Sequence, residues 1–101
     1  KNTLIYKKRR DYAFDCLKHH FNDSIQIKKP SGGLAIWIEF TPSISLVQLA
    51  EQVSKLDVFL PKTLLYQDKN TCAIRFGFGH LNEEEIEIVV SRLKQAYNSI
   101  K

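Results

Sequence analysis

Residues 72–78 read Cys-Ala-Ile-Arg-Phe-Gly-Phe, which is typical of a strand that is buried on one side only. Successive side chains of a strand point to opposite faces, so Ile74 and Phe76 share one face. Arg75 then projects from the other face, where the neighbouring Gly77 leaves room for a second molecule. The pattern predicts a sheet with one apolar face and one face that carries an arginine.

The segments on either side of this strand predict the remaining elements. Asn82 and Glu85 have the capping-box spacing that starts a helix, and Ser45 and Gln48 have the same spacing earlier in the chain. Periodicity predicts helices over about 4–22, 46–56 and 83–97, strands over 25–27, 34–40, 58–60 and 72–78, and a loop over 61–71. This order indicates an α+β two-layer sandwich: a small, mostly antiparallel sheet of three or four strands with three helices packed on one face.

Length and composition favour a single domain over residues 1–101. The chain has 101 residues, of which 44 % are apolar, so it can form a core. No apolar run approaches the roughly 20 residues of a membrane span, and no signal peptide is visible. We therefore expect no membrane partner and a cytoplasmic location. Because the chain contains no methionine, not even at position 1, we expect it to be excised from a longer protein.

The cysteines and histidines predict neither a metal site nor a catalytic centre. Cys16 and Cys72 lack C-x-x-C spacing, and we expect both to be buried, reduced thiols. His19 and His20 are adjacent on a helix, so they point about 100° apart and cannot chelate one ion together. Zinc binding at this pair is therefore an unfavoured interpretation.

The formal net charge of +4 leaves nucleic-acid binding open. The run 7–10, Lys-Lys-Arg-Arg, covers all sides of a helix, which favours a solvated turn over one basic face. Residues 75–79, Arg-Phe-Gly-Phe-Gly, are superficially similar to the RNA-binding signature of RRM domains. Phe76 and Phe78 share the apolar face, however, whereas that signature needs exposed aromatic rings. A free-standing basic RNA-binding module stays an alternative.

Arg75 is the candidate binding residue. A guanidinium is planar and rigid, and it can bind both oxygens of a carboxylate through two parallel hydrogen bonds. The alternative is an ordinary arginine on a solvated sheet face.

Four stretches of the chain, in order, resemble the C-terminal small domain of fold-type I pyridoxal-phosphate-dependent aminotransferases of class I and II. They are Tyr6-x-x-Arg9-Arg10-Asp11, Pro30-x-Gly32-Gly33-Leu34-x-x-Trp37, Val58-x-x-Pro61 and Ile74-Arg75-Phe76-Gly77-Phe78. The resemblance covers essentially the whole chain. With its ending Gly77-Phe78-Gly79-His80-Leu81-Asn82-Glu83, the last stretch is most similar to the aminotransferase-like domain of GntR/MocR-type transcriptional regulators. Lys62 departs from the family, which usually has glycine after this proline.

The resemblance implies roles for three residues. Arg75 would bind the α-carboxylate of an amino acid or related amine, and Gly32 and Gly33 would lie near the substrate entrance. It implies pyridoxal 5'-phosphate as the cofactor of the parent protein, held mainly by a large domain that this sequence lacks. We therefore expect no catalytic or cofactor-binding residue here, and no activity of the isolated domain.

The resemblance also implies partners. The parent would be a homodimer, and as a regulator it would bind DNA through an N-terminal winged-helix domain. A true amino-acid aminotransferase is the alternative parent, so whether the parent catalyses transamination or only senses a ligand stays open. We expect the large domain to dock on an apolar patch of the sheet, to which Trp37 or Tyr66 contributes.

Overall fold

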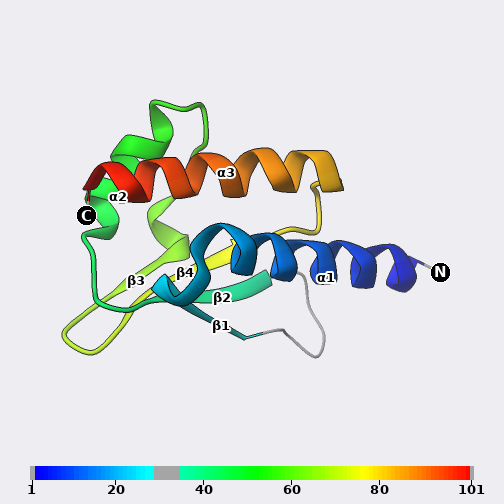
Figure 1. Ribbon diagram of the computed structural model, residues 1–101, viewed down its shortest axis with the longest axis horizontal. Coiled ribbons are helices and arrows are strands. Elements are labelled where there is room, and N and C mark those ends of the chain that lie inside the picture. Colours follow the sequence, from blue (N-terminus) through cyan, green and yellow to red (C-terminus); the bar gives the residue numbers. More distant parts are fainter. Residues whose placement is uncertain (1, 29–34, 101) are drawn as a thin grey trace.

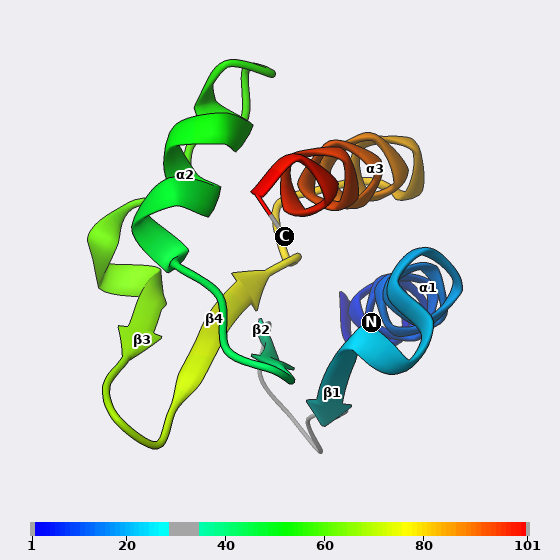
Figure 2. The same ribbon diagram turned by 60° about the vertical axis from the view of Figure 1, so that its left-hand side comes forward.

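The strands and helices form two layers in the computed structural model, which describes residues 2–28 and 35–100. The elements are α1 (Asn2–Phe21), β1 (Ile25–Lys28), β2 (Ala35–Phe40), α2 (Leu46–Ser54), β3 (Leu65–Gln67), β4 (Cys72–Gly77) and α3 (Glu83–Ile100), with 3-10 turns η1 (Asn22–Ser24) and η2 (Lys62–Leu64). The sheet has the strand order β1-β2-β4-β3, and its neighbours pair antiparallel. The helices lie on one side of it (Figures 1 and 2), which confirms the predicted α+β sandwich.

The core lies between the helices and one face of the sheet. α1 and α3 lie side by side and run in the same direction across the sheet (Figure 1). Alternate residues of β2 and β4 point toward them, and Ile36, Ile38 and Ile74 have no exposed surface. Phe78 follows β4 and is equally buried. Each such side chain contributes about 1.5–3 kcal/mol relative to an exposed one.

Both predicted capping sites are confirmed. At α2 the Ser45 hydroxyl accepts a hydrogen bond from the Gln48 backbone N–H at 3.2 Å. At α3 the bonds are reciprocal: the Glu85 N–H donates to Asn82 Oδ1 at 2.8 Å, and the Asn82 N–H donates to Glu85 Oε1 at 2.9 Å. These bonds satisfy backbone donors that have no partner inside the helix. The starts of α2 and α3 are therefore set by local sequence.

The strand predicted over 58–60 is wrong, because this segment terminates α2 instead. Asp57 has a φ of 67°, and the Val58 N–H donates to the Val53 carbonyl at 3.1 Å. This is the Schellman pattern that closes a helix at its C-terminus. Phe59 is 79 % exposed, so the apolar residues that suggested a strand do not all enter the core.

The strand at 65–67 lies in the segment predicted as a loop. Leu65, Tyr66 and Gln67 pair with Ile74, Ala73 and Cys72, respectively. The connection is a tight turn in which Asp68 Oδ1 accepts hydrogen bonds from the backbone N–H groups of Asn70 and Thr71, both at 2.8 Å. A three-residue strand has no clear periodicity, so only its pairing with β4 reveals it.

Lys62 occupies its position without backbone strain. It begins η2 after Pro61, and the non-glycine residues with positive φ in the described ranges are Asn22 and Asp57. The local conformation therefore does not require the glycine that is usual in the family. None of the helices described for residues 2–28 and 35–100 is long and apolar enough to cross a membrane.

Candidate functional site

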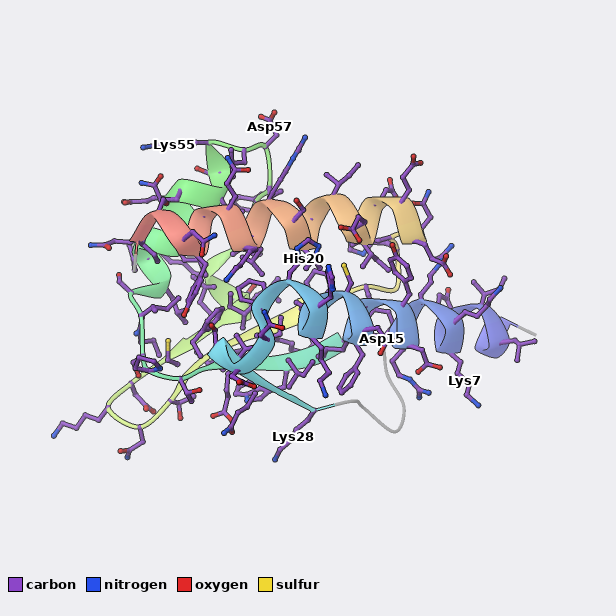
Figure 3. All side chains as sticks on the ribbon, viewed as in Figure 1. Lys7, Asp15, His20, Lys28, Lys55 and Asp57 are labelled. Atoms are coloured by element: carbon purple, nitrogen blue, oxygen red, sulfur yellow. The ribbon has the colours of Figure 1, made fainter. Side chains whose placement is uncertain are left out.

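Arg75 lies on the face of the sheet that none of the described helices covers. The strand register places Lys28, Trp37 and Arg75 in one row across β1, β2 and β4. Arg75 is exposed, and Figure 3 shows Lys28 pointing away from the helices. Within the described ranges, no residue forms a hydrogen bond or ion pair with the Arg75 guanidinium. The predicted orientation, opposite to Ile74 and Phe76, is confirmed.

An aromatic pair lies beside this row. The rings of Trp37 and Tyr66 are 4.9 Å apart between centroids and tilted by 47°. They flank Ala73, which pairs with Tyr66 in the sheet. Ala73 has no exposed surface although it faces away from the helices, as expected if the two rings shield it. The rings therefore give the open face a fixed apolar surface next to Arg75.

A cavity of about 420 Å³ borders Arg75 on one side. β3 pairs with β4 only as far as Ile74, so the edge of β4 is open beyond that residue toward the 57–60 segment. The cavity is lined by Asp57, Val58, Phe59, Leu60, Leu64, Arg75, Phe76, Gly77, His80, Leu81 and Val89. Its walls are mostly apolar, with three polar side chains. The volume is large enough for a small molecule.

Two further predictions concern the glycines at 32 and 33 and the aromatic residues of β4. Gly32 and Gly33 lie outside the described residues, so their place near a substrate entrance stays a prediction. Phe76 and Phe78 are 5 % and 0 % exposed, so β4 does not present the aromatic rings of an RRM.

The basic run does not form one face, as predicted. The Arg9 side chain donates from Nη1 to the Gly79 carbonyl at 3.0 Å, which ties α1 to the loop before α3. Arg10 pairs with Asp11 at 3.2 Å. Lys7 and Lys8 are exposed.

A second group of polar side chains connects α1 to α3. The Glu87 carboxylate accepts hydrogen bonds from the Tyr12 hydroxyl at 3.3 Å and the Cys16 thiol at 3.2 Å, both at Oε1. His20 Nε2 lies 2.8 Å from Glu87 Oε2. Figure 3 shows His20 between the two helices. Glu87 therefore has partners on three successive turns of α1.

The cluster shifts the pKa of three of its members, and in Tyr12 burial and then the Glu87 charge raise the pKa of the hydroxyl. Burial and then the hydrogen bond to Glu87 raise the pKa of the Cys16 thiol to about 12, whereas hydrogen bonds from His20 and Cys16 lower the pKa of Glu87. Both cysteines are buried and free, as predicted, and burial also raises the pKa of Cys72. The sequence does not predict this cluster, because Glu87 is 67 residues from His20 and only the packing of α1 against α3 brings them together. The local signal was Cys16, one turn before His20.

No family model matches the chain. Its fold matches LysN, the α-aminoadipate aminotransferase of Thermus thermophilus, with a TM-score of 0.78 and 19 % identity, over 93 % of this chain and 25 % of that one. It matches the kynurenine aminotransferase of Pyrococcus horikoshii with a TM-score of 0.78 and 25 % identity, over 93 % of this chain and 24 % of that one. The chain has the aminotransferase small-domain fold.

A sequence relative connects this small-domain fold to transcription. The chain is 25 % identical over 81 residues to the uncharacterized HTH-type transcriptional regulator YdfD of Bacillus subtilis (strain 168), over 80 % of this chain and 17 % of the regulator. The predicted resemblance to an aminotransferase-like domain of a regulator is thereby confirmed. The chain spans less than a fifth of that regulator and about a quarter of the solved aminotransferases.

The residues around Arg75 fit a carboxylate ligand but not the pyridoxal phosphate cofactor. LysN was solved with N-(5'-phosphopyridoxyl)-L-leucine, a cofactor–amino acid adduct. The described residues that line the cavity of this small-domain fold include no lysine that could attach such a cofactor. They offer one guanidinium, one imidazole and one carboxylate, from Arg75, His80 and Asp57, beside apolar walls. The described lining therefore offers cationic groups for an anion but no amine to which the cofactor could be attached.

Proposed function

We propose that this chain is the small domain of a GntR/MocR-type regulator and that Arg75 binds the carboxylate of an amino-acid effector. The observation that carries the proposal is an exposed arginine, without a partner among the described residues, at the rim of an apolar cavity. A solvated arginine needs no such surroundings. The aminotransferase fold and the similarity to a regulator support the same function.

The geometry around Arg75 supports this proposed role. Its side chain projects from a central strand that is paired with β2, so the position of its Cα is fixed. Trp37 lies directly opposite in the register and limits the side chain on that flank. A guanidinium that is held in this way can orient a carboxylate through two parallel hydrogen bonds. The small Gly77, two residues on, leaves space for the rest of the ligand.

The cofactor and the DNA-binding part belong to the proposed parent. Pyridoxal phosphate, when bound to the large domain, supplies the group that reacts with the effector's amine. An effector that is held at both ends would favour one arrangement of the small and large domains. The change in domain arrangement would in turn move an N-terminal winged-helix domain. We further propose a cytoplasmic homodimer. The function thus requires residues beyond this chain.

The test uses a protein in which this chain is joined to its cofactor-binding domain. Amino acids are titrated while the absorbance of the bound cofactor is followed, and the cofactor affinity is measured separately. Arg75→Ala should raise the Kd for the amino acid about 10- to 150-fold, as expected for losing a charged hydrogen bond of about 1.5–3 kcal/mol. The cofactor affinity should not change. Arg75→Lys should give an intermediate Kd, because lysine keeps the charge without the fork.

Lys28→Ala is the matched control, because Lys28 is a cation in the same row of the same face. It should leave the Kd for the amino acid within about threefold of that of the unmodified protein. Trp37 lies between Lys28 and Arg75 in the row, and an exposed charge two strands away is screened by salt. If Arg75→Ala and Lys28→Ala weaken amino-acid binding equally, the positive charge of the whole sheet face attracts the ligand and Arg75 is not a specific binding residue. An unchanged Kd in Arg75→Ala would refute the role of Arg75.

A further inference from the structure

Three metal-ligating side chains converge between α1 and α3, away from the open sheet face. Cys16 Sγ, a ring nitrogen of His20 and a carboxylate oxygen of Glu87 all lie within 4.8 Å of one another. Cys16 and His20 are four residues apart on one helix, so their side chains lie on the same face one turn apart. Glu87 completes the group from the neighbouring helix. The convergence follows from helix packing and depends on no loop.

The separations approach those of a tetrahedral site. Ligand bonds of about 2.0–2.3 Å to zinc put neighbouring ligand atoms roughly 3.3–3.8 Å apart in a tetrahedron. Here Cys16 Sγ lies 3.2 Å from Glu87 Oε1, and His20 Nε2 lies 2.8 Å from Glu87 Oε2. An ion would enter by replacing these direct hydrogen bonds, and the two pairs of atoms that they join would move apart by less than about 1 Å. Rotation of the Glu87 and His20 side chains can supply that movement.

We propose that Cys16, His20 and Glu87 bind one Zn²⁺-class divalent ion, with water as the fourth ligand. A thiolate, an imidazole and a carboxylate together suit zinc and related transition metals, whereas Mg²⁺ and Ca²⁺ prefer oxygen ligands alone. The site is independent of Arg75 and of the proposed function. Bound metal would fasten α1 to α3.

The surroundings of the three ligands support this assignment. Tyr12 donates its hydroxyl hydrogen to Glu87 Oε1, so it orients the carboxylate as outer partners of metal ligands do. The side chains of His20 and Glu87 are 22 % and 47 % exposed, which gives an ion a route from solvent. Cys16 is buried, which shields its sulfur. A bound cation would favour the thiolate of Cys16, and the thiol proton would be released to solvent as the ion binds.

Cobalt provides the direct test, because a Co²⁺–thiolate bond gives a charge-transfer band in the near ultraviolet. The untagged, reduced chain is titrated with Co²⁺ and then with Zn²⁺, which should displace the cobalt. We expect saturation at one ion per chain and visible bands of tetrahedral intensity. Zinc should raise the Tm of the chain, and EDTA should reverse the increase. A chain without a thiolate–cobalt band would refute the site.

The adjacent histidines provide a matched pair of variants. His20→Ala should weaken Co²⁺ binding by at least about a hundredfold, more than the loss of an outer partner usually does. His19→Ala should leave it unchanged, since His19 is exposed and no metal-ligating group in the described ranges includes it. Equal effects of these two substitutions would show that the ion binds elsewhere.

The remaining variants separate metal binding from folding. Glu87→Gln should weaken Co²⁺ binding about as much as His20→Ala, and Tyr12→Phe should weaken it about tenfold. Cys16→Ser should abolish the charge-transfer band, whereas Cys72→Ala should keep it. If Cys16→Ser does not fold, the strength of the cobalt charge-transfer band in His20→Ala and Glu87→Gln still tests the site. A band of full strength in both of these variants would overturn the proposal.

Discussion

The two faces of the sheet carry different side chains on the same strands. On the covered face, Ile38, Ile74 and Phe76 lie under the helices in the core cluster. On the open face, Trp37 and Arg75 occupy the alternate positions of β2 and β4. Residues that are adjacent in sequence therefore have opposite tasks: one contributes to stability and the next is available for binding. The pleat of the strand, with its period of two, produces this division.

Substitution of the neighbouring residues Ile74 and Arg75 should give the largest difference in stability between the two faces. Ile74→Ala removes a side chain with no exposed surface and should lower the free energy of unfolding by about 2–5 kcal/mol. Arg75→Ala should change it by no more than about 0.5 kcal/mol, because Arg75 is exposed and forms no hydrogen bond with the described residues. Urea denaturation of both variants measures the difference. A loss above about 2 kcal/mol in Arg75→Ala would mean that the open face also contributes to the core.

The covered face depends on helices that start correctly, and α3 can be weakened at its cap alone. Asn82→Ala removes the side-chain oxygen that accepts from the Glu85 N–H, and it should lower the free energy of unfolding by about 0.5–2 kcal/mol. Asn82→Ser should retain most of the stability, because serine is also a good cap. Thermal and urea denaturation of the two variants provide the measurement. Equal stabilities of the alanine and serine variants would argue against a role of the cap.

The aromatic pair of the open face should contribute less than a core residue. A double-mutant cycle with Trp37→Leu and Tyr66→Leu isolates the interaction between the two rings. Their contact at 4.9 Å predicts a coupling free energy of about 0.5–1.5 kcal/mol. The cycle is measured by urea denaturation. A coupling near zero would show that the rings do not form a fixed surface beside Arg75.

The smallest expected effect concerns the segment that borders the Arg75 cavity. Asp57 has a left-handed backbone, which glycine adopts without steric cost. Asp57→Gly should therefore raise the free energy of unfolding by about 0.5–1 kcal/mol, offset in part by the greater freedom of glycine in the unfolded chain. Asp57→Ala is the control and should give no gain. A destabilised glycine variant would mean that the Asp57 side chain has a task in this turn.

Local sequence predicted those elements whose boundaries are set by side chains a few residues apart. The Ser45 and Asn82 caps are examples, since the bonds that start α2 and α3 join residues three positions apart. A strand was predicted at 58–60 and a loop at 65–67, whereas the structure has the strand at 65–67. Both segments are short and only partly apolar, so their sequences do not distinguish the two states. Their states depend on a helix terminus and on pairing with β4, respectively. The conformation of such a short segment is set by the neighbour against which the tertiary structure places it.

The candidate site also has one feature that the sequence predicts and others that it does not. The alternation in 72–78 is enough to predict that Arg75 faces away from the core, because the strand period is a local property. The position of the 57–60 segment beside Arg75 and the contacts of Glu87 with Cys16 and His20 depend on how the elements pack together. Those contacts join residues that are far apart in the sequence. Helix and strand packing determine such distances, and no local rule of the sequence contains them.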